Sequence, residues 1–181
     1  MSIPFIISIM SSDRVGIIAD VTTSILKLNG NLDALNQTVL KGYFTMILLA
    51  HFPEGTNAED IRDFMHNVPN LAECEIGVIP YRERKGNDLE AESNAYILTA
   101  SGPDKAGLVS AVSEYLRLKR INIIDFNSRM DNGIYTMMLM IVLPPKMDVG
   151  KLQKSIQIAM EEHNLTIGIR HQAIFSKVND I

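Results

Sequence analysis

A seven-residue stretch occurs twice in this chain, and its repetition constrains the fold more than any other feature. The first copy is Ser-Asp-Arg-Val-Gly-Ile-Ile at residues 12–18, and the second is Pro-Asp-Lys-Ala-Gly-Leu-Val at residues 103–109, a spacing of 91 residues. Each copy follows one apolar run and opens another, which predicts a strand, a turn and the start of a helix. A repeat of this length is too long for a solenoid unit and indicates a duplicated small domain.

The correspondence at this spacing extends well beyond the two motifs. The matched pairs are Val21 with Val112, Asn31 with Asn122, Asn36 with Asn127, Gly42 with Gly133, Thr45 with Thr136, and Pro53 with Pro144. The charged segment between the halves has little to bury, so we expect it to be a solvated linker. The predicted organisation is a first domain at residues 1–81, a linker at 82–93 and a second domain at 94–181.

Four apolar runs of the first half predict strands: residues 3–10, 31–40, 43–52 and 71–79. Lys41-Gly42 joins the second run to the third, and glycine permits the positive φ that a tight hairpin turn needs. The second half repeats this order of apolar runs.

Two helices are predicted in each half. Asp13 is a suitable N-cap for the first helix, and the apolar stripe would contain Ile18, Val21 and Ile25, or Val109, Val112 and Leu116 in the second copy. Thr56 and Glu59 form a capping-box pattern before the second helix. The stripe of that helix would contain Ile61, Phe64, Met65 and Val68, with Leu152, Ile156, Ala159 and Met160 as the second copy.

The order βαββαβ predicts an α+β fold of the ferredoxin-like type, in which both helices cover one face of a four-stranded antiparallel sheet. The third strand of each half is apolar on both sides, at residues 46–50 and 137–142. An antiparallel strand with one wet face should alternate polar and apolar residues. We therefore expect the uncovered face to be buried against the sister domain or another subunit.

Asp-x-x-Gly-aliphatic between the first strand and first helix, with Asn-aliphatic opening the second strand, resembles the ACT domain. The residues that carry the resemblance are Asp13, Gly16, Ile17, Asn31 and Leu32, then Asp104, Gly107, Leu108, Asn122 and Ile123. The similarity covers nearly the whole chain, as two ACT domains. A tandem chain of this size resembles the glycine cleavage system transcriptional repressor family, whose members are thought to act through a partner protein. Val15 and Ala106 replace the proline of one common form of the motif, which leaves the ligand's identity open.

The Asp-x-x-Gly motif also has a physical role that is independent of the resemblance. A helix that starts after Asp13 leaves the N–H groups of Arg14–Ile17 without internal acceptors, and Gly16 would let a ligand approach them closely. Lys105–Leu108 and Gly107 repeat this arrangement. A carboxylate suits such a helix start, and Asn31 or Asn122 offers an amide at the neighbouring strand. The alternative is that these residues only cap helices and shape loops.

Composition narrows the function classes. The net charge of −4 argues against broad contact with nucleic acid, and no apolar run approaches the ~20 residues of a membrane span. The N-terminus lacks the pattern of a signal peptide, and the single cysteine, Cys74, agrees with a reducing compartment, so we expect a cytoplasmic protein. The four histidines show no metal-ligand spacing. We therefore expect no metal, no cofactor and no catalysis.

The function predicted from these features is the sensing of a small ligand, an amino acid such as glycine, by a homodimer that acts on a protein partner. That partner would be a transcription factor or an enzyme. The main alternative is a regulatory subunit of an amino-acid biosynthetic enzyme. Acylphosphatases and RNA-recognition domains share the topology, but the former need one domain with an anion cradle, and the latter need more aromatic residues on the sheet.

Overall fold

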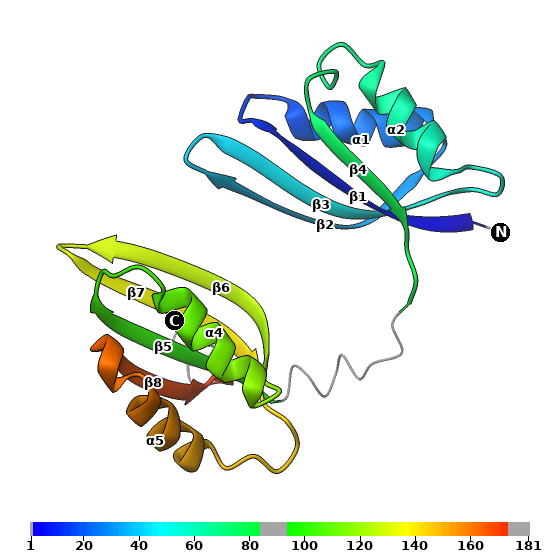
Figure 1. Cartoon of the computed structure of the whole chain (residues 1–181). Coiled ribbons are helices and arrows are strands. Elements are labelled where there is room, and N and C mark those ends of the chain that lie inside the picture. Colours follow the sequence, from blue (N-terminus) through cyan, green and yellow to red (C-terminus); the bar gives the residue numbers. More distant parts are fainter. Residues whose placement is uncertain (1, 84–93, 174–181) are drawn as a thin grey trace, which may run out of the picture. The chain divides into compact units, whose positions relative to one another are not determined.

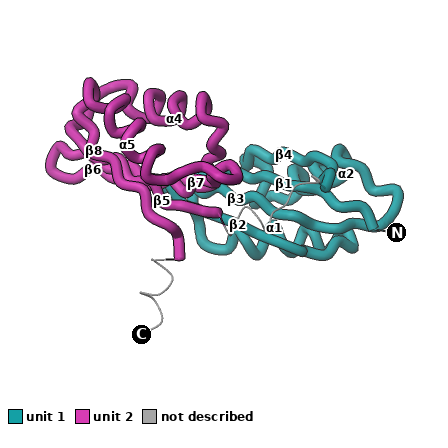
Figure 2. Tube along the Cα trace, turned by 90° about the horizontal axis from the view of Figure 1, so that it is seen from below, with its two compact units in different colours: residues 1–84 teal, residues 85–181 magenta. Residues whose placement is uncertain are grey.

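The computed structural model describes residues 2–83 and 94–173 and divides the chain into two compact units, residues 1–84 and 85–181. Figure 2 colours the two units separately. Most of the predicted linker, from residue 84 to residue 93, lies outside the described residues. Each unit has its own hydrophobic core.

Both units have the order βαββαβ (Figure 1). The elements of unit 1 are β1 (Ser2–Ser12), α1 (Ile17–Lys27), β2 (Asn31–Leu40), β3 (Tyr43–Pro53), α2 (Ala58–His66) and β4 (Glu75–Pro80). Those of unit 2 are β5 (Ala95–Pro103), α4 (Leu108–Leu118), β6 (Asn122–Asp131), β7 (Ile134–Val142), α5 (Val149–Ala159), a 3₁₀ turn (Glu161–His163) and β8 (Thr166–His171). The sheet orders are β2-β3-β1-β4 and β6-β7-β5-β8, with antiparallel neighbours. The predicted pair of ferredoxin-like domains is confirmed.

The two hairpins turn where the sequence predicts. Lys41 and Gly42 have φ of 50° and 85°, and Asn132 and Gly133 have φ of 48° and 77°. Positive φ at both central residues defines a turn whose twist matches that of the flanking strands. This geometry places each hairpin tip beside the turn between the first strand and first helix of its unit.

The inner face of each sheet supplies the core, and the outer face stays exposed in the single chain. Met46 and Leu48 are buried beneath the helices, whereas Ile47 between them is 52% exposed. In unit 2, Met138 is 51% exposed between the buried Met137 and Leu139. The outer face would therefore be buried, as predicted, only when another protein surface covers it.

Two expectations about helix caps are wrong. Gly16, in left-handed conformation, occupies the N-cap position instead of Asp13, and Gly107 occupies the equivalent position in unit 2. The second helix of unit 1 is capped by Asn57, whose side chain accepts from the N–H groups of Glu59 and Asp60, and not by Thr56.

The inner stripes of the first helices also begin one residue earlier than predicted. Ile17 and Leu108 are buried, whereas Ile18 and Val109 are 41% and 40% exposed. The reason is that Ile17, Val21 and Ile25 recur every fourth residue and share the face toward the sheet.

Candidate functional site

The first Asp-x-x-Gly turn connects β1 to α1 and is held by backbone hydrogen bonds at both ends. The N–H of Asp13 donates to the carbonyl of Gly42 in the hairpin tip at 2.8 Å, and the N–H of Asp20 donates to the carbonyl of Gly16 at 2.9 Å. Gly16 has φ of 89°, a conformation that strains any residue with a Cβ. The glycine is thus required by the turn itself, whether or not a ligand binds there.

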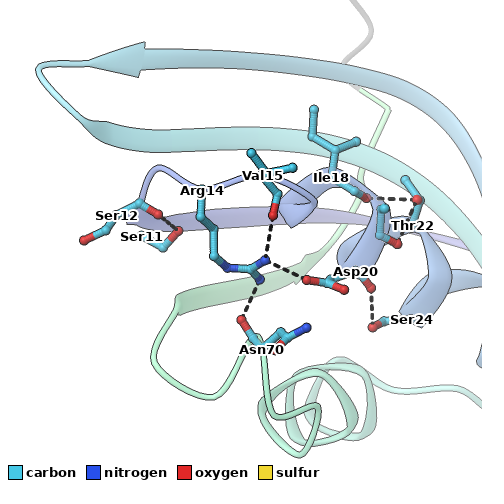
Figure 3. A network of polar contacts seen from close by, with 10 residues as sticks. Ser11, Ser12, Arg14, Val15, Ile18, Asp20, Thr22, Ser24 and Asn70 are labelled. Atoms are coloured by element: carbon cyan, nitrogen blue, oxygen red, sulfur yellow. Dashed lines mark hydrogen bonds and ion pairs between the residues drawn. The ribbon is translucent and has the colours of Figure 1, made fainter.

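Arg14 ties this turn to the rest of unit 1 (Figure 3). Its Nη2 donates to the carbonyl of Asn70 at 2.7 Å, in the loop between α2 and β4. Its Nη1 lies 2.8 Å from Oδ2 of Asp20, one turn into α1. Both side chains of this ion pair are about one-third exposed or less. The guanidinium therefore has an internal anion and an internal carbonyl as partners.

The second turn, between β5 and α4, has the same backbone frame. The N–H of Asp104 donates to the carbonyl of Gly133 at 3.2 Å, and the N–H of Ala111 donates to the carbonyl of Gly107 at 2.9 Å. Gly107 has φ of 92°. Within the described ranges, the N–H groups of residues 14–17 and 105–108 have no backbone acceptor. Both turns thus present free donors, as predicted.

An open pocket of about 600 Å³ lies at the second turn. Its lining residues are Asp104, Lys105, Gly107, Leu108, Val109, Ser110 and Tyr135. The first four belong to the predicted site, whereas Val109, Ser110 and Tyr135 were missed. A comparison of the halves at the spacing of 91 residues could have singled out Ser110 and Tyr135. Their counterparts in unit 1, Ala19 and Phe44, have no hydroxyl group. The wall of the pocket is mainly apolar, and its lining residues include one acid, one lysine and two residues that carry a hydroxyl group.

The predicted amides lie at the other end of each unit. Ser12 and Leu40 both pair with Tyr43, whereas Asn31 pairs with His51, eight residues further along β3. Eight residues of strand span about 26 Å. In unit 2, Asn122 likewise pairs with Val142 at the end of β7, whereas the Gly107 turn lies beside the start of β7. Leu32 and Ile123 are the next residues along the chain and lie at the same far end. Because of this separation, one unit cannot bring its turn and its amide to the same small ligand.

Asn31 lines a separate polar pocket of about 540 Å³ with Asn29, Asp33 and His51. Nε2 of His51 lies 3.7 Å from Oδ2 of Asp33. Asp33 is at a bulge of β2, between the residues that pair with Ala50 and Leu49. A further pocket, of about 530 Å³, lies on the outer face of the first sheet and is lined by Ser8, Asn36, Thr45, Ile47, Gly77 and their neighbours.

Other features of the described residues bear on the expected chemistry. No group of three or more His, Cys, Asp or Glu side chains in residues 2–83 and 94–173 could hold a metal ion. No helix of these residues is both long and apolar enough to cross a membrane. Outside the pocket, Arg117 donates to Glu114 at 2.7 Å and holds the pKa of that carboxyl below its usual value.

Comparison with known proteins identifies the family. A sequence profile described as "ACT domain" matches residues 95–170. The UPF0237 protein DIP1286 of Corynebacterium diphtheriae is 41% identical over 64 residues, which are 35% of this chain and 72% of that protein. The UPF0237 protein of Methanosarcina acetivorans is 44% identical over 62 residues, 34% of this chain. The match spans 65% of the length of the M. acetivorans protein and 54% of that of a second relative, from Methanosarcina mazei.

Solved structures show that the fold extends over both units. A protein of unknown function from Galdieria sulphuraria matches with a TM-score of 0.75 and 22% identity, over 94% of this chain and 98% of that one. A protein provisionally named glycine cleavage system transcriptional repressor matches with a TM-score of 0.71 and 10% identity, over 94% and 97% of the two chains. The chain belongs to the ACT-domain family and contains the ACT fold twice.

Proposed function

We propose that this protein is a non-catalytic regulator that senses an amino acid through its ACT domains and acts through a protein partner. The observation that carries the proposal is the pocket at the Gly107 turn, a mainly apolar hollow whose lining residues include Asp104 and Lys105. An α-amino acid has the complementary pair, an ammonium group for Asp104 and a carboxylate for Lys105. Charge-assisted hydrogen bonds of this kind are stronger than neutral ones.

The regulatory role is supported by the ACT fold, and glycine is the first ligand to test because of the provisional name of one structural neighbour. Sensing also requires that the ligand bind two states of the protein with different affinity, because only this difference shifts an equilibrium that a partner can detect. A transcription factor or an enzyme in the cytoplasm would be such a partner.

A thermal-shift panel of the standard amino acids, with glycine first, tests the proposal. A ligand present at 100 times its dissociation constant adds about 2.7 kcal/mol to the free energy of unfolding, which raises Tm by several degrees. We expect one amino acid or a small related group to raise Tm, and calorimetric titration to give a saturable heat. If no amino acid changes Tm or produces heat, the proposed sensing role is wrong.

A further inference from the structure

The outer faces of the two sheets, which the helices leave uncovered (Figure 1), contain the same row of residues. In unit 1 the row crosses the four strands as Gly77, Ser8, Ile47 and Asn36, and in unit 2 it crosses them as Gly168, Thr99, Met138 and Asn127. Each residue of the first row is 91 positions before its counterpart in the second. The two outer faces therefore share one pattern, although they belong to different units.

The glycine of each row keeps one edge of the outer face low. A Cβ on Gly77 would lie 2.6 Å from Oγ of Ser8, and a Cβ on Gly168 would lie 2.9 Å from Oγ1 of Thr99. A glycine inside a strand often marks a place where another backbone approaches closely. Two strands away, the large apolar residue of the row is 52% exposed in unit 1 and 51% exposed in unit 2. Each face thus combines an apolar centre with a shallow edge, and a second sheet can pack on such a surface.

One charged side chain on each outer face has no partner in the described part of the chain. Glu75 of β4 and Arg170 of β8 both lie on the outer face of their sheet, two residues from the glycine of the row. Neither forms an ion pair or a side-chain hydrogen bond with a described residue. Their counterparts at the spacing of 91 residues are Thr166 and Ile79, which have no charge. The unpaired acid is therefore specific to unit 1, and the unpaired base is specific to unit 2.

The other charged side chains of the two faces have partners within their own unit. The contacts join Nε2 of His51 to Oδ2 of Asp33 at 3.7 Å, Nη2 of Arg129 to Oδ2 of Asp131 at 3.7 Å, and Nδ2 of Asn127 to Oδ2 of Asp125 at 3.0 Å. Glu75 and Arg170 are therefore the two charges that a covering surface has to match.

The strand register shows which surface can match them. Glu75 lies two residues from the row toward the hairpin tip, whereas Arg170 lies two residues from the row in the opposite direction. If the two faces stack with β4 over β8 and with their strands antiparallel, the rows superpose and the carboxylate meets the guanidinium. Two copies of the first face stacked in this way would place Glu75 against Ile79, and a carboxylate buried without a partner is costly. The pairing of a first face with a second face is the arrangement that satisfies both charges.

We infer that the outer face of unit 1 in one copy of the chain packs on the outer face of unit 2 in a second copy, and that the exchange is reciprocal. The inference concerns assembly and does not depend on the proposed ligand. Four strands about 4.8 Å apart, each contributing about six residues of ~3.3 Å, give each face about 400 Å². One such contact would bury about 800 Å², less than the roughly 1,200 Å² of a stable interface, whereas two contacts would bury about 1,600 Å². A reciprocal contact also closes on itself, so association stops at the dimer.

Charge exchange tests the inference, with analytical ultracentrifugation of the full chain measuring the mass and the dissociation constant of the dimer. Glu75→Arg and Arg170→Glu should each raise this constant by at least about tenfold, because each variant places like charges opposite each other in both contacts. The double variant Glu75→Arg/Arg170→Glu should return it close to that of the unmodified chain, since the pair is restored with its polarity reversed. Lys154→Glu is the matched control: it reverses an exposed base on α5, which covers the inner face of the sheet, and should leave the constant unchanged.

A lysine at the centre of the second face provides an independent test. Met138→Lys should dissociate the dimer as Ile47→Lys does, because both residues lie in the same contact, and circular dichroism checks that each variant is folded. Dissociation by Ile47→Lys but not by Met138→Lys would assign the interface to two copies of the first face and overturn the inference. A monomer at every concentration, a species larger than a dimer, or charge reversals whose effects add instead of cancelling would overturn it as well.

Discussion

Gly16 and Gly107 are required by backbone conformation alone. An added Cβ at either glycine would meet no atom within 4 Å, so space is not the reason for glycine. Their φ values of 89° and 92° are the reason, because L-residues with a Cβ are strained in the left-handed region. A bulky residue here would strain the turn as well as cover its N–H groups. Loss of binding in a leucine variant would therefore not identify the site, and the exposed Lys105 is the better position to change.

We predict that Gly16→Ala lowers the free energy of unfolding by about 1 to 2 kcal/mol, and that Gly16→Asn lowers it less because asparagine tolerates positive φ. Urea unfolding of the full chain measures both. Gly150→Ala is the matched control, because Gly150 lies in the first turn of α5 without positive φ and alanine there is not strained. Equal stability of Gly16→Ala and the unmodified chain would show that the turn relaxes without cost.

At the scale of single elements, Asn57 caps the N-terminus of α2, and its neighbour Thr56, which could also cap a helix, does not. Asn57 Oδ1 accepts from the N–H groups of Glu59 and Asp60 at 3.0 and 2.9 Å, whereas the Thr56 side chain makes no such bond. We predict that Asn57→Ala destabilises unit 1 by about 1 kcal/mol and that Thr56→Ala has a much smaller effect. Thermal unfolding of both variants checks this. A larger loss for Thr56→Ala would contradict the observed cap.

The sequence was sufficient to predict strands, helices and hairpins, but not the helix ends. Apolar periodicity is a property of many residues together. Assigning Ile18 instead of Ile17 to the buried stripe was wrong, but it did not change the prediction of a helix. A cap depends on one or two hydrogen bonds, and Asp13 and Thr56 are both suitable by type alone. The Arg14 contact with Asn70 joins residues 56 positions apart in two loops, and no periodic pattern reports such a contact.

The candidate site was predictable only in the parts that depend on local chain geometry. The Asp-x-x-Gly motif gives the turn and its free N–H groups, since these follow from local chain geometry. The position of Asn31 relative to the turn depends on the length of α1 and the register of β2 on β3, which places the two at opposite ends of the unit. Tyr135 reaches the pocket from β7, which only the folded sheet brings beside the Gly107 turn.

At the scale of the whole molecule, the outer face of each sheet exposes a large apolar side chain at the centre of its third strand. Ile47 and Met138 are 52% and 51% exposed at the centres of β3 and β7. One wet face is normal for an antiparallel sheet, but such a face is ordinarily polar. Exposed apolar side chains rimmed by polar residues, here Ser8 and Asn36 beside Ile47, are a feature of surfaces that contact another protein. This supports the proposal that the chain forms a homodimer.

We predict that the protein elutes with the mass of a dimer in size-exclusion chromatography with light scattering, and that Ile47→Lys shifts it toward the monomer. A lysine forced into an apolar interface loses its hydration without gaining a partner, which disfavours association. Leu26→Lys is the matched control, because Leu26 is an apolar residue, 71% exposed, on α1 instead of the outer sheet face. If both lysine variants dissociate the dimer equally, the interface is not the sheet face. A chain that is monomeric at every concentration would show that no second copy covers these faces, and ligand sensing would then have to operate within a single chain.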